Sequence, residues 1–190
     1  MDSATTQGET GGRHLYAPFS WVRLHPVAAL LPAIVVLGVA LRALGLNYCM
    51  SPDEVFCQEN ILRLGWRGAV WFPYTSANHP LPSLCGWFFG TVFGDRDWAY
   101  QLFPFIVGTL SIPAMYFYAA RALRDTRIGL LAAFLLAISS YHAGYSANMR
   151  GYVPAIFFAL LFSYSLLACF ERPRWHHAPA LGVSLFLMAM

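Results

Sequence analysis

Long apolar stretches separated by short polar turns dominate the sequence. The first four stretches are each about twenty residues long, enough for one helix across a hydrocarbon core of roughly 30 Å. We therefore predict transmembrane helices over residues 26–46, 98–120, 128–145, 152–170 and 178–190. The fifth stretch is still apolar at Met190, so we expect a truncated, N-terminal portion of a longer membrane domain. The predicted fold class is all-α, a polytopic transmembrane helical bundle.

Residues 81–94 form a shorter apolar segment that contains Pro82 and three glycines. This length favours an interfacial or re-entrant helix over a membrane span. If the segment does not cross, seven arginines lie in the cytoplasm and five outside, with Arg42 near the outer end of the first span counted as outside, whereas a crossing gives four inside and eight outside. The positive-inside rule favours the first arrangement. It predicts a cytoplasmic N-terminus, disordered over residues 1–25, and an extracytoplasmic loop 47–97 containing juxtamembrane helices.

Composition supports a lipid environment. Apolar residues make up 58% of the 190 positions and charged residues 11%, against about a quarter in soluble domains. The net charge of +3 comes from arginines in separate short loops, a pattern typical of topology signals and not of a nucleic-acid surface. We therefore predict a multi-pass protein of the cell (plasma) membrane, with the lipid bilayer and no nucleic acid among its partners.

The cysteines do not indicate a metal site. The four cysteines lack CxxC spacing and a histidine at ligand distance, which argues against zinc. Cys49 and Cys57 flank an acidic segment of the predicted outer loop, where a disulfide can form. Two free thiols are the alternative, and the sequence leaves both open.

The acidic segment is Ser51-Pro52-Asp53-Glu54, just after the first predicted span. Paired carboxylates at a membrane surface can bind a divalent cation such as Mg²⁺ or Mn²⁺, and one of them can act as a general base. The same residues also form a good helix start, with a capping serine, proline in the first turn and acids near the positive end of the helix dipole. Both roles are compatible, because capping would fix the position of the carboxylates.

Two further polar groups fall on the same predicted side of the membrane. His79 opens the short apolar segment and could bind a phosphate or a sugar hydroxyl, although an interfacial histidine without a chemical role is common. Arg150 lies in the loop 144–151, where it could grip a phosphate with two hydrogen bonds or extend to lipid headgroups. Transporters instead place charges near the bilayer midplane. Clustering at one face favours chemistry on a lipid-linked substrate.

The order of these features resembles the membrane glycosyltransferases of the GT-C type. The common features are a first span, an Asp-Glu pair, a His-Pro element, a proline-containing span and a Tyr-Ser-x-x-x-Arg-x-Tyr loop at 145–152. Within that group the chain is similar to the family 39-like enzymes, which include protein O-mannosyltransferases and lipid A aminoarabinose transferases. The resemblance covers residues 26–170. It implies that a sugar moves from a polyprenyl-phosphate donor to a protein, lipid or glycan acceptor at the extracytoplasmic face.

The resemblance also implies roles for individual residues. Asp53 and Glu54 correspond to the catalytic acidic element, with Asp53 as the base or a metal-linked carboxylate. His79, Asn148 and Arg150 correspond to substrate-binding positions, with His79 near the lipid phosphate. Asn148 stands where the family often has a carboxylate, and Gln101 where it often has an arginine. We expect an inverting transfer. The alternative is a non-catalytic multi-pass protein, either a transporter-like subunit or a truncated, inactive relative.

Overall fold

The computed structural model describes residues 30–46, 50–72, 78–171, 173, 175 and 177–190. This described part is helical and contains no strand. The predicted disordered segment 1–25, the start of the first span and Cys49 lie outside the described residues.

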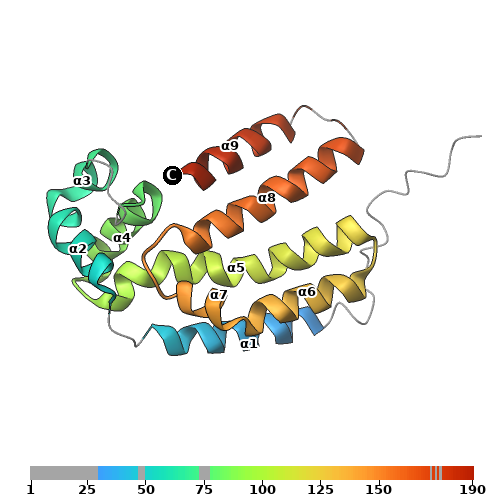
Figure 1. The fold of residues 1–190 in the computed structure, drawn as a ribbon, viewed down its shortest axis with the longest axis horizontal. Coiled ribbons are helices and arrows are strands. Elements are labelled where there is room, and N and C mark those ends of the chain that lie inside the picture. Colours follow the sequence, from blue (N-terminus) through green and yellow to red (C-terminus); the bar gives the residue numbers. More distant parts are fainter. Residues whose placement is uncertain (1–29, 47–49, 73–77, 172, 174, 176) are drawn as a thin grey trace, which may run out of the picture.

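One long helix, α5, organises a bundle. It packs against α1, α6 and α8, and α9 packs against α8 (Figure 1). Helix α5 has 27 residues with Pro104 and Pro113 inside it, and 27 residues correspond to about 40 Å of helix. The bundle helices are α1 (Leu30–Gly45), α5 (Asp97–Leu123), α6 (Thr126–Ile138), α8 (Tyr152–Glu171) and α9 (His177–Ala189).

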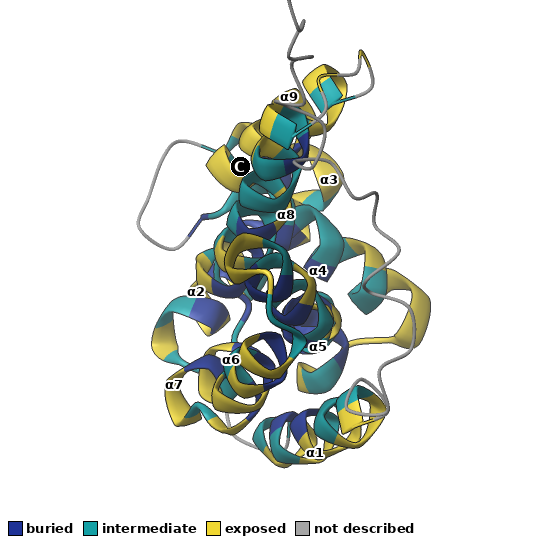
Figure 2. Ribbon diagram, turned by 90° about the vertical axis from the view of Figure 1, so that its right-hand side faces the viewer, coloured by how far each residue is buried: buried dark blue, intermediate teal, exposed yellow. Residues whose placement is uncertain are grey.

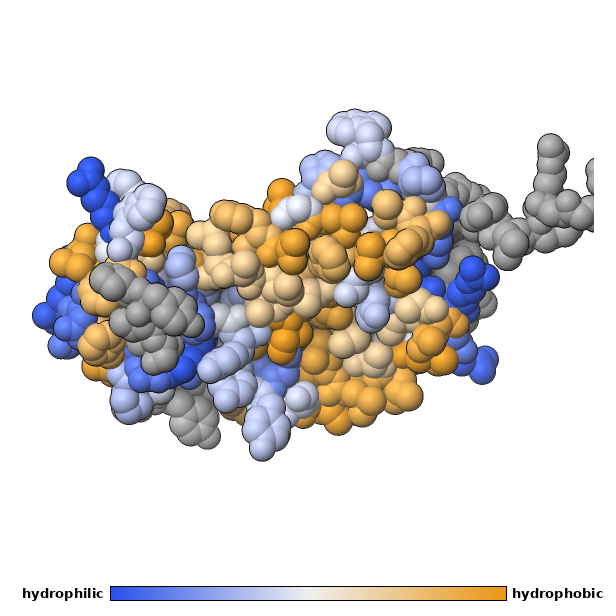
Figure 3. Space-filling view, turned by 45° about the horizontal axis from the view of Figure 1, so that its top comes forward, coloured by the Kyte–Doolittle hydropathy of each residue, from blue (hydrophilic) through white to orange (hydrophobic). Residues whose placement is uncertain are grey.

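The outer surface of the bundle is apolar. Large hydrophobic side chains such as Val36, Leu131 and Phe186 are more than half exposed, while buried residues face the interior (Figure 2). On the face shown in Figure 3, hydrophobic residues cover the middle of the molecule and hydrophilic residues gather toward its two ends. By length and composition, α5 and α8 are long and apolar enough to cross a membrane, and α1, α6 and α9 are shorter apolar helices. The protein is an all-α membrane protein.

Short helices form a cap at one end of the bundle (Figure 1). The cap consists of α2 (Pro52–Asn60), the 3-10 helix η3 (Leu62–Leu64), α3 (Gly65–Trp71) and α4 (Pro80–Phe93). Helix α4 corresponds to the predicted short helix 81–94, and its 14 residues extend about 21 Å, less than a typical hydrocarbon core. The buried residues of the cap core are Met50, Cys57, Ile61, Leu62, Ala69, Tyr100 and Met149.

Cys57 is a free cysteine within this core. It is 1% exposed, and its Sγ lies 3.5 Å from Ser83 Oγ. Burial raises the pKa of the thiol, which lowers the fraction of reactive thiolate at neutral pH.

The apolar stretch 128–145, predicted as one span, is interrupted. Helix α6 ends at Ile138, and α7 (Ser140–Tyr145) begins after Ser139, whose backbone is extended. The Ser139 hydroxyl accepts a hydrogen bond from the backbone N–H of His142 and so caps α7. Serine competes for backbone hydrogen bonds in this way, which favours a new helix start over continuation of α6.

Candidate active site at the cap end of the bundle

The first site element is the beginning of α2. Ser51 is the N-cap residue, Pro52 occupies the first turn, and Glu54 Oε2 accepts the Ser51 backbone N–H at 2.8 Å. This bond is the glutamate half of a capping box, and it fixes the first turn with the two neighbouring carboxylates in different environments. Glu54 is 2% exposed, whereas the side chain of Asp53 is 49% exposed.

The second site element is the α7–α8 loop, residues 146–151. The backbone N–H of Met149 donates to Glu54 Oε1 at 2.6 Å, and the Met149 side chain is buried in the cap core. Glu54 therefore accepts backbone hydrogen bonds with both oxygens, one from its own helix start and one from a residue 95 positions away. These bonds favour a positioning role for this carboxylate.

An ion pair joins the exposed carboxylate to the same loop. Arg150 Nη2 contacts Asp53 Oδ2, and the Arg150 side chain is 18% exposed. The pair sits next to the Glu54–Met149 hydrogen bond, so two adjacent residues of α2 hold two adjacent residues of the loop. The structure thereby brings together the acidic pair and the arginine that the sequence singled out.

His79 lies beside the C-terminal end of the same loop. It precedes α4, its ring centroid is 6.1 Å from that of Tyr152, and a Cβ added to Gly151 would lie 2.8 Å from its Nδ1. Only glycine leaves room for the imidazole at position 151. Burial lowers the pKa of His79 below its usual value of about 6.5, so the ring is neutral at pH 7. Its Nε2 has no hydrogen-bond partner within the described residues.

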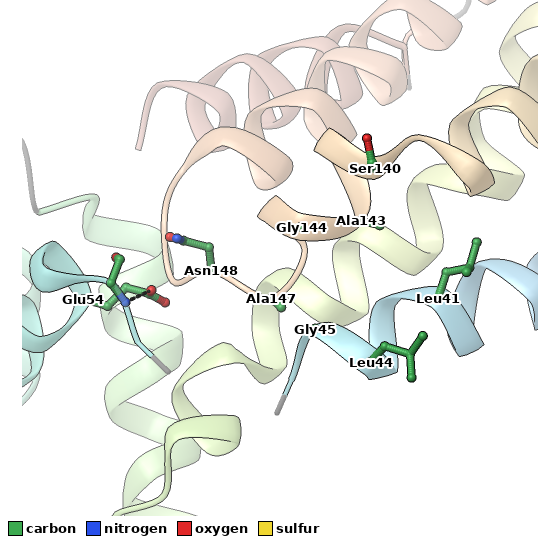
Figure 4. A pocket seen from close by; sticks show the side chains of 10 residues that line it. Leu41, Leu44, Gly45, Glu54, Ser140, Ala143, Gly144, Ala147 and Asn148 are labelled. Carbon is green, nitrogen blue, oxygen red and sulfur yellow. Dashed lines mark hydrogen bonds between the residues drawn. The ribbon is translucent and has the colours of Figure 1, made fainter. Parts of the chain in front are cut away.

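A pocket of about 430 Å³ opens beside the loop, between the end of α1, the start of α2 and α7. Two buried polar atoms in its lining, Ser51 Oγ and Asn148 Oδ1, have no hydrogen-bond partner in the described part of the chain. Figure 4 shows Asn148 directed toward the start of α2, with Gly144 and Ala147 forming part of the wall. These atoms can bind hydroxyl groups, because an amide oxygen accepts and a serine hydroxyl both donates and accepts.

The donor set at this site fits a metal ion poorly. Among the residues that the structure describes, no three His, Cys, Asp or Glu side chains lie together in a way that could hold a metal. Glu54 is committed to backbone N–H groups, and Asp53 already has a cationic partner in Arg150. A divalent cation at Asp53 would have to replace the guanidinium.

One contributor to the site was not singled out from the sequence. Met149 anchors the loop through its side chain and its N–H, and the only hint was an apolar residue within a polar segment. Gln101, noted from the sequence where the family often has an arginine, is 1% exposed, and its Oε1 is buried without a partner in the described residues.

The chain matches a known protein family. A family model described as dolichyl-phosphate-mannose-protein mannosyltransferase matches residues 75–190. The chain belongs to this family. The match to the mannosyltransferase family includes His79, Asn148 and Arg150, whereas Asp53 and Glu54 precede it. No curated protein and no solved structure matches the chain. Membership makes the protein a membrane glycosyltransferase that uses a polyprenyl-phosphate-linked sugar.

Proposed function

We propose that the protein transfers a sugar from a polyprenyl-phosphate donor to a hydroxyl acceptor at the extracytoplasmic face of the plasma membrane. The observation that carries this proposal is the ion pair between Asp53 and Arg150 at the cap end of an apolar bundle. It supplies a carboxylate and a guanidinium within one small site, and these are the groups that the transfer requires. The acceptor is a protein, a lipid or a glycan.

The reaction is a direct displacement at the anomeric carbon. Asp53 takes the proton of the acceptor hydroxyl as its oxygen bonds to the anomeric carbon. The bond between that carbon and the phosphate oxygen breaks, and both electrons leave with the lipid phosphate. Arg150 binds the departing phosphate, since guanidinium matches phosphate with paired hydrogen bonds. One displacement inverts the anomeric configuration.

The ion pair also suggests an order of binding. In the structure Arg150 pairs with Asp53, so that carboxylate is already engaged by a cation. A donor phosphate competes for the guanidinium, and Asp53 becomes available to the acceptor once Arg150 has turned to the phosphate. The polyprenyl chain lies along the exposed apolar surface of the bundle, in contact with lipid.

The remaining site residues bind the sugar and the phosphate. Asn148 and Ser51 offer unpartnered polar atoms to sugar hydroxyls in the pocket. Neutral His79, beside Gly151 and Tyr152, contributes one ring nitrogen near the phosphate. The N-terminus is cytoplasmic in this arrangement, and the cap faces outward.

The decisive experiment is Asp53→Asn in the reconstituted chain, supplied with a labelled polyprenyl-phosphate sugar and a hydroxyl acceptor. We expect transfer to be abolished while insertion and thermal unfolding stay close to wild type, because the amide keeps the shape but not the basicity. Asp97→Asn is the matched control, since Asp97 is an exposed acid at the same end of the bundle. Transfer by Asp53→Asn, or a product that retains the donor's anomeric configuration, would overturn the mechanism.

A further inference from the structure

Arg42 is a fully buried arginine within the apolar helix α1, with 0% of its surface exposed. A charged side chain within a membrane helix costs roughly 2.5–3.5 kcal/mol at the helix centre on insertion scales. Such a residue is retained where it makes specific contacts. No part of the transfer chemistry uses Arg42, so its contacts require their own account.

The guanidinium of Arg42 joins three helices. Its Nη1 donates to the carbonyls of Gly38 at 2.9 Å and Ala137 at 3.3 Å. Its Nη2 donates to the carbonyl of Leu136 at 3.3 Å and to Nδ1 of His142 at 2.7 Å. These partners lie on α1, at the end of α6 and in α7.

The interruption at Ser139 explains why two carbonyls at the end of α6 accept hydrogen bonds from Arg42. The last four carbonyls of a helix lack intrahelical donors, so the break after Ile138 leaves Leu136 and Ala137 in need of partners. A cation is also favourable at the negative end of the α6 dipole. Arginine can only donate, so Nδ1 of His142 is the acceptor and any ring proton of the neutral form is on Nε2.

The contacts continue from α7 into the site. The carbonyl of His142 accepts the Ser146 hydroxyl at 2.6 Å, and Ser146 is fully buried at the start of the α7–α8 loop. A Cβ added to Gly45 would lie 2.9 Å from Cβ of Ala147, so the end of α1 also touches the loop directly. Three residues further along, Arg150 meets Asp53.

We infer that Arg42 is a positioning residue for the glycosyl transfer. By holding the α6–α7 break against α1, it sets the depth of the α7–α8 loop, and so places Arg150 against Asp53 and Met149 against Glu54. It touches neither substrate nor the reacting groups. This inference rests on the proposed function for its kinetic part, and on the structure alone for its effect on the loop.

Hydrogen exchange tests the effect on the loop without any activity. In the wild-type chain the Met149 amide, buried and bonded to Glu54, exchanges slowly. We expect Arg42→Met to raise exchange in the peptide 145–152 by at least about tenfold, with α8 unchanged. Arg121→Met is the control, because Arg121 also lies within the bundle but binds Glu171 at the other end of α5 and α8. Unchanged exchange of the loop in Arg42→Met would overturn the inference.

A double-mutant cycle tests the kinetic part. Arg42→Met should raise the donor KM several-fold in the wild-type background and have little further effect in Arg150→Ala, because it acts through Arg150. Arg42→Lys keeps the charge and some of the hydrogen-bond donors, so its donor KM should lie closer to the wild-type value. This variant replaces Arg42→Met in the cycle if Arg42→Met does not fold. Equal effects in both backgrounds would show that Arg42 only stabilises the fold, which overturns the inference. If the wild-type chain transfers no sugar, the proposed function fails, and hydrogen exchange still decides whether Arg42 holds the loop.

Discussion

The carboxylate of Glu54 accepts the backbone N–H of Met149, with 2.6 Å between Met149 N and Glu54 Oε1. This bond is buried and joins the start of α2 to the α7–α8 loop. The two acidic residues therefore differ in role. Glu54 holds the site together, and Asp53 faces the accessible side of the site.

Replacing Glu54 should therefore destabilise the protein. Glu54→Ala leaves two backbone N–H groups, of Ser51 and Met149, without their charged acceptor, and each hydrogen bond to a charged group contributes about 1.5–3 kcal/mol. We expect a clear fall in the thermal midpoint of unfolding in detergent. Glu59→Ala on the same helix is the control, because Glu59 lies in an exposed ion pair with Arg63. Equal midpoints for the two variants would contradict the positioning role.

Arg150→Ala should weaken donor binding. Losing a charge-assisted contact to phosphate corresponds to about ten- to a hundredfold in affinity, so we expect the donor KM to rise in that range and the acceptor KM to change little. The donor KM of Arg150→Lys should lie between those of the wild type and Arg150→Ala, since lysine keeps the charge but cannot form the paired hydrogen bonds. Initial rates against donor concentration measure this, with exposed Arg67→Ala as the control. An unchanged donor KM would remove Arg150 from the phosphate site.

A chelator distinguishes a role of the Arg150 guanidinium in transfer from a role of a metal ion. Because Arg150 already pairs with Asp53, we propose that it supplies the positive charge at the phosphate. Transfer should then persist after treatment with EDTA. Loss of transfer on chelation, restored by Mg²⁺ or Mn²⁺, would instead place a divalent cation at Asp53.

The burial of His79 predicts a dependence of stability on pH. Its pKa is lowered in the folded state, so below about pH 6.5 the unfolded chain binds a proton at this residue more readily than the folded chain does. The folded state is therefore destabilised as the pH falls from about 7 to 5. The midpoint of unfolding should fall less steeply over this range in His79→Asn than in the wild type. Parallel curves would show that His79 is not held in its neutral form.

Many of the helices could be predicted from the sequence, because the hydrocarbon core of a membrane requires long apolar helices. Helices α8 and α9 fall on predicted spans, and α4 on the predicted short helix. The α6–α7 break could not be predicted from hydropathy, since Ser139 interrupts a run that stays apolar on both sides. The helix start at Ser51 could be predicted locally, because the hydrogen bond between the Ser51 N–H and the Glu54 side chain lies within four consecutive residues.

The sequence alone predicts a helical membrane protein and the residue types of its site. Hydropathy and capping are local properties, and the family resemblance rests on the order of short motifs. Only the tertiary structure shows that the Asp53 carboxylate is exposed and that the Glu54 carboxylate is buried. It also brought Arg150 to Asp53 and gave buried Arg42 its partners on α6 and α7. These contacts join residues about a hundred positions apart. The packing of α1 against α6 and α7 brings Arg42 to its partners, and the contact of α2 with the α7–α8 loop brings Arg150 to Asp53.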